Sequence, residues 1–124
     1  MTYRAPISDI LLALNHGAGL KAAVKVGHYG DFDADITTAV LEEAGKFASD
    51  VLTPLNRVGD QHGIKLDGGK VITAPGWPDA YKRWTEAGWN AVSGPEAFGG
   101  QGLPLVINAA CTEIWSASNV AFGL

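Results

Sequence analysis

The residues that could do chemistry are few and far apart along the chain of 124 residues. Glu96 and Glu113 are the carboxylates nearest a glycine-rich segment, and two carboxylates in one cleft could exchange protons with a substrate. We expect structural roles instead. Glu96 is predicted to cap or solvate the loop. Glu113, at the border of an apolar helix face, is predicted to form an ion pair with Arg83 or Arg57.

Residues that bind metals in other proteins are also dispersed. The single cysteine, Cys111, is expected to be a buried thiol. Three histidines lack ligand spacing, and three alternating aspartates lack the other ligands of a calcium loop, so the aspartates are interpreted as helix-start charges. We therefore predict no metal site from these residues: His16, His28, His62, Asp31, Asp33 and Asp35.

A glycine-rich loop, Gly99-Gly100-Gln101-Gly102, precedes Pro104 and an apolar run. Such a loop at a helix N-terminus could hold a phosphate group. It matches neither the P-loop nor the dinucleotide-binding pattern, and no predicted strand leads into it. A structural corner is the favoured interpretation, with Pro104 setting the first turn of the following helix.

Composition narrows the class of protein. Hydrophobic residues make up 47% and charged residues 18% of the chain, which is typical of a globular domain. The formal net charge of −4 gives no basic footprint for nucleic acid. One cysteine allows no intrachain disulfide, and no apolar run reaches the length of a membrane span. With no recognisable signal peptide, a cytoplasmic location is predicted.

Two units are predicted. Residues 1–30 form an N-terminal extension whose short helix is capped by Ser8 or Asp9 and ended by Gly17 and Gly19. A connecting arm follows from Lys21 to Gly30. Residues 31–124 form a mainly α domain with a small β-hairpin. Its first long helix starts at Asp33 or Asp35. Its apolar face is Ile36, Val40, Ala44, Phe47, Val51, Leu55 and Val58, widened by Leu41, Ala48 and Leu52.

Pro54 lies inside the first long helix and should kink it near Asp50.

Three further elements follow that helix. Asp67-Gly68-Gly69 predicts a hairpin, which must lean on helices because two short strands alone are marginal. A second helix is predicted from Pro78 to Ala87. The last helix runs from about Pro104 to the end and is apolar almost all round, which is typical of a buried helix. We therefore expect the natural polypeptide to continue past this helix, so that residues 31–124 are a truncated domain.

The segment Pro95-Glu96-Ala97-Phe98-Gly99-Gly100-Gln101-Gly102-Leu103 resembles the Pro-Glu-x-(Tyr/Phe)-Gly-Gly-x-Gly segment of acyl-CoA dehydrogenases. In that family it precedes a helix carrying a glutamate, matched here by Glu113. Residues 41–48 and 51–60 look like the first long helix of the family, and residues 60–69 resemble its small hairpin region. The opening Tyr3-Arg4-Ala5-Pro6 resembles the extension of the branch that includes the methylthiopropionyl-CoA dehydrogenases.

The resemblance covers the first of three domains in that family and implies a function for the complete protein. A catalytic glutamate in a later domain removes the acyl α-proton while the β-hydride passes to FAD, and an electron-transferring flavoprotein takes the electrons. The complete enzyme would be a homo-oligomer. This chain would carry no catalytic, FAD-binding or metal-binding residue and would be inactive alone. It would line the acyl-chain pocket with Val120, Ala121, Phe122 and Leu124, and also with Trp115, whose large ring could close the pocket or simply pack.

A second hypothesis stays open at this point. The same helical fold could be a stand-alone interaction or oligomerisation module without catalytic activity. The downstream reading frame separates the two hypotheses, because only the enzyme requires the middle and C-terminal domains.

Overall fold

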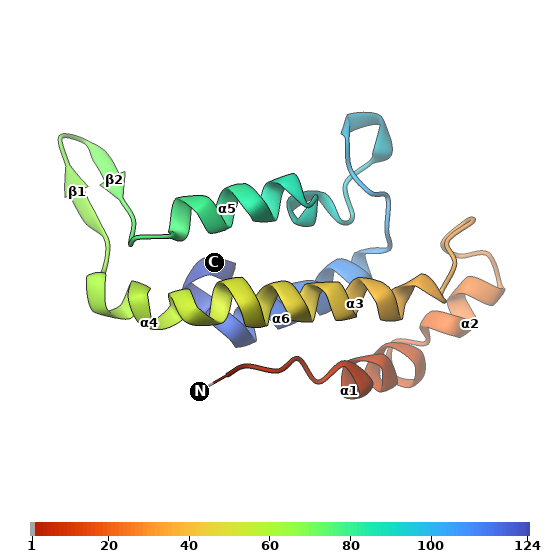
Figure 1. Cartoon of the computed structure of the whole chain (residues 1–124). Coiled ribbons are helices and arrows are strands. Elements are labelled where there is room, and N and C mark those ends of the chain that lie inside the picture. The colour runs from red at the N-terminus through yellow and green to blue at the C-terminus, as the bar shows by residue number, and fades with distance from the viewer. Residues whose placement is uncertain (1) are drawn as a thin grey trace.

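The computed structural model describes residues 2–124. Figure 1 shows a helical domain with a two-stranded hairpin projecting from one end. Its elements are α1 (Ile7–Leu12), α2 (Leu20–Lys25), α3 (Ile36–Phe47), α4 (Thr53–His62), β1 (Lys65–Asp67), β2 (Lys70–Ile72), α5 (Trp77–Glu86) and α6 (Leu105–Gly123). The mainly α class with a small hairpin is therefore confirmed.

The predicted first long helix is present as a rod made of α3, a π-helical turn (Ala48–Leu52) and α4. Pro54 has no N–H, and its ring would clash with the carbonyl group of Asp50 in a regular α-helix. A π turn widens the backbone at that point. The structure thus has a π turn around Asp50, where a kink was predicted, and Gly63 ends the rod with φ 63°.

The core lies between this rod and α6, which run side by side (Figure 1). Leu41 and Leu52 of the rod are fully buried, whereas Ile36 is 40% exposed, so the buried face is centred on residues predicted only to widen it. On α6 the buried residues recur at helical spacing. The largest fully buried side chains include Leu20, Leu41, Leu52, Val92, Ile107 and Ile114.

The N-terminal extension is more helical than predicted. No side chain caps α1, whose N-cap position is Pro6, so the proposed caps Ser8 and Asp9 are wrong. The predicted connecting arm from Lys21 to Gly30 begins instead with α2. Leu20 explains the difference, because its side chain is 1% exposed and anchors this helix to the core.

The hairpin forms where predicted but does not lean on helices. Lys65 pairs with Ile72, Leu66 with Val71, and Asp67 with Lys70. Gly68 and Gly69 both have positive φ, as a tight two-residue turn of type I′ requires. Every residue of both strands is exposed, and Leu66 is 76% exposed, so the predicted support from helices is wrong.

The glycine-rich loop is a corner closed by its own backbone. The N–H groups of Gln101, Gly102 and Leu103 donate to the carbonyl oxygens of Ala91, Gly94 and Val92 at 2.9 to 3.0 Å. Amides paired in this way are not free to hold a phosphate group, which favours the structural interpretation. The α5 helix, predicted from Pro78 to Ala87, spans Trp77–Glu86.

Candidate functional site

The last turn of α6 folds back on its own helix. Asn119 has φ −159° and ψ 88°, so the helix breaks there and a new turn, Val120–Gly123, starts in another direction. A Cβ placed on Gly123 would lie 3.5 Å from the backbone of Ser116, seven residues earlier. In a straight helix these residues would be about 10 Å apart along the axis. We call Val120–Gly123 the return turn.

Aromatic side chains hold the return turn against α5. The ring centroids of Phe122 and Trp77 are 5.9 Å apart, and those of Phe122 and Trp84 are 6.1 Å apart. Such tilted and edge-to-face pairs add to the stability gained from burial alone. Phe122 therefore ties the end of α6 to the start and middle of α5.

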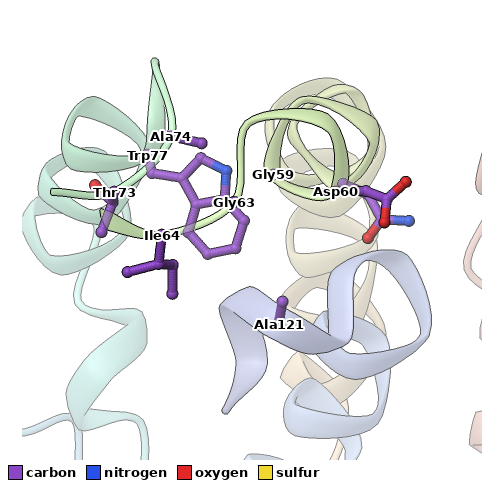
Figure 2. A pocket seen from close by; sticks show the side chains of 9 residues that line it. Gly59, Asp60, Gly63, Ile64, Thr73, Ala74, Trp77 and Ala121 are labelled. Atoms are coloured by element: carbon purple, nitrogen blue, oxygen red, sulfur yellow. The ribbon is translucent and has the colours of Figure 1, made fainter. Parts of the chain in front are cut away.

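A small cavity of about 230 Å³ lies beside this cluster (Figure 2). Figure 2 shows the Ala121 methyl group pointing toward the indole of Trp77, with Ile64 below the same ring. The lining comes from α4, from the two ends of the hairpin, from the first residue of α5 and from the return turn. Its residues are Asn56, Gly59, Asp60, Gly63, Ile64, Thr73, Ala74, Trp77 and Ala121.

Gly59 allows the Trp77 ring to form one side of the cavity. A Cβ at this position would come within 2.7 Å of Trp77 Cζ2, so only glycine lets this edge of the indole lie so close to α4. The indole Nε1 is buried and, within residues 2–124, has no hydrogen-bond partner. The carbon atoms of the ring present an apolar surface to the cavity.

The five predicted pocket residues differ in burial and in what they contact. Ala121 lines the cavity and Phe122 packs behind it, whereas Val120 is 55% exposed and Leu124 is fully exposed. Trp115 is 4% exposed in the core, where it contacts Phe47 and Trp89. Trp115 therefore packs in the core of this domain, and the binding role of all five residues stays a prediction.

Sequence reasoning missed most of the cavity lining because three distant segments build it. The small residue Gly59 in an otherwise regular helix, followed by an isolated Trp77, was the available signal. A glycine that is not needed for a turn often marks a close approach by another group.

The predicted ion pair of Glu113 with Arg83 or Arg57 is wrong. Glu113 is exposed, and the ion pairs seen within residues 2–124 are Glu43 with Lys46 and Lys82 with Glu86. Glu113 lies at the rim of a groove between α1 and α6. The pKa of Tyr3 is raised by burial and, to a smaller extent, by the negative charge of Glu113.

Cys111 is a buried thiol, as predicted. Burial raises its pKa to about 11, so the thiol stays protonated and unreactive near neutral pH. Within residues 2–124, no group of three or more histidine, cysteine or acidic side chains is arranged to hold a metal ion.

The comparison with known proteins shows what this chain is similar to. The chain is 37% identical, over all 124 residues, to the 3-methylmercaptopropionyl-CoA dehydrogenase of Ruegeria pomeroyi. That protein is an acyl-CoA dehydrogenase. This chain is homologous to part of an acyl-CoA dehydrogenase. It spans about a fifth (21%) of the length of this relative. No family model matches the sequence.

The acyl-CoA dehydrogenase resemblance first noted at the glycine-rich corner therefore extends over the whole chain. The part of the chain that the structure describes contains no helix long and apolar enough to cross a membrane.

Proposed function

We propose that the complete protein is an FAD-dependent acyl-CoA dehydrogenase that removes hydrogens from the α and β carbons of an acyl-CoA thioester. The observation that carries this proposal is the 37% identity over all 124 residues to a dehydrogenase of this type. This chain would supply part of the wall of the acyl-chain pocket and would be inactive alone.

The chemistry of the cavity beside Trp77 supports a role in binding an acyl chain. Most of its lining is apolar, and Ile64, Trp77 and Ala121 provide the hydrocarbon surface. Each methylene group moved from water onto such a surface gains about 0.8 kcal/mol. A wall that excludes water also strengthens the electrostatic interactions around reacting carbons.

The residues of this cavity do not fit FAD. Its charged lining residue is Asp60, and no basic side chain lies in the lining to hold the pyrophosphate. FAD, when bound elsewhere in the complete protein, would accept the hydride. An electron-transferring flavoprotein as electron acceptor, a homo-oligomeric assembly and a cytoplasmic location belong to the same proposal.

Flavin reduction by substrate tests this function. The complete protein should purify with a flavin absorbance band, and anaerobic addition of an acyl-CoA should bleach that band as the flavin is reduced. Residues 1–124 expressed alone are the matched control and should be colourless. A complete protein that binds no flavin, or whose flavin no acyl-CoA of any chain length reduces, would contradict the proposal and favour the interaction module.

A further inference from the structure

We infer that Asn119 is a positioning residue whose side chain clamps the return turn to α4 and thereby holds the cavity wall in place. The clamp consists of two hydrogen bonds that the Asn119 side chain makes within this chain. Its consequence for substrate binding rests on the proposed function, because only an acyl-CoA dehydrogenase would place an acyl chain against this wall.

The oxygen and the nitrogen of the Asn119 side-chain amide make different hydrogen bonds. Its Oδ1 accepts a hydrogen bond from the backbone N–H of Phe122 at 3.1 Å. This is the bond that an N-cap residue makes with the third residue of a helix. Asn119 therefore starts the return turn as a new helical turn, which closes when the Leu124 N–H donates to the Val120 carbonyl oxygen at 3.0 Å.

The other end reaches a distant part of the chain. Asn119 Nδ2 donates to the backbone carbonyl oxygen of Leu52 at 3.1 Å. Leu52 is the last residue of the π turn, immediately before α4 begins. The amide thus joins the break in α6 to the irregular turn in the rod.

Because Asn119 is buried, its side-chain amide depends on hydrogen-bond partners within the protein. Asn119 is 1% exposed, although asparagine is normally found at the surface. Removing the amide would take one hydrogen-bond partner from the Leu52 carbonyl and one from the Phe122 N–H, and the loss of the Leu52 bond lies in a buried region, which is costly. The two hydrogen bonds explain why an asparagine occupies such a buried position.

The clamp connects to the cavity through the two residues that follow. Ala121 lines the cavity and Phe122 packs between Trp77 and Trp84. If the return turn were released, α6 could straighten, and both side chains would leave their places beside α5. The position of Asn119 therefore decides whether the wall exists.

Hydrogen exchange of the complete protein, without substrate, tests the clamp directly. In Asn119→Ala we expect the amides of residues 120–124 to exchange about tenfold faster or more, with α3 unchanged. Asn119→Asp is isosteric but cannot donate to Leu52 when ionised, and it should also loosen this segment. Asn108→Ala, on the half-exposed part of α6, is the matched control and should change nothing. Unchanged exchange in both Asn119 variants would overturn the inference.

Steady-state kinetics of the same variants tests the link to substrate. Asn119→Ala and Asn119→Asp should raise KM for an acyl-CoA about fivefold with kcat within about twofold, because the lost wall binds ground state and transition state alike. A general loss of folding would lower kcat instead, and a fall in kcat at unchanged KM would contradict the positioning role. If the wild type shows no dehydrogenase activity, the proposed function fails, whereas the exchange result still decides the clamp.

Discussion

Gly100→Ala is expected to destabilise the 124-residue chain by about 3 kcal/mol. A Cβ at this position would overlap the carbonyl group of Gly94 and come within 2.7 Å of its Cα. The overlapping atoms belong to the backbone of Gly94, so they cannot move away as the end of a side chain could. The loop must therefore open. Opening would pull apart the backbone hydrogen bonds that join residues 91–94 to residues 101–103.

Denaturant unfolding of the variant measures this cost, and the melting temperature should fall by about 10 °C or more. Gly17→Ala is the matched control. A Cβ there meets nothing within 4 Å, so its free energy of unfolding should stay within about 0.5 kcal/mol of wild type. Equal effects in the two variants would mean that the corner is not close-packed.

Ile114→Ala is expected to cost about 2 to 5 kcal/mol of stability. Ile114 is fully buried on α6 in the core that faces the rod. Truncation removes methyl and methylene groups from contact and leaves a cavity that rigid helices cannot fill. Unfolding by urea, followed by circular dichroism at 222 nm, would measure the loss.

Leu105→Ala on the same helix is the comparison for Ile114. Leu105 is 71% exposed, so its truncation should change the free energy of unfolding by less than about 0.5 kcal/mol. A loss at Leu105 as large as that at Ile114 would contradict the assignment of the buried face of α6.

Local patterns predicted the elements well where one residue type imposes the geometry. Pro54 indicated the distortion of the rod, and the four-residue segment at Gly99 indicated the corner. Backbone chemistry decides both features. Pro78 at the first turn and Gly88 as the stop also located α5 to within one residue at each end.

The candidate site was much less predictable because it depends on tertiary packing. An asparagine near the end of an apolar helix suggests a polar stripe, and nothing local shows that Asn119 breaks the helix to reach Leu52. Two short strands alone are marginal, which suggested that the hairpin packs on helices, yet Leu66 and Val71 are exposed. Such outcomes depend on which distant segments meet.

The central claim is that the return turn of α6 and Trp77 form a wall against the acyl chain. It is tested most directly by photocrosslinking the complete protein with an acyl-CoA that carries a diazirine near the end of its chain. Peptide mass spectrometry should find labelling at Trp77 or on residues 119–124, and unmodified acyl-CoA should compete it away. Competed labelling found only on residues outside this chain would contradict the claim.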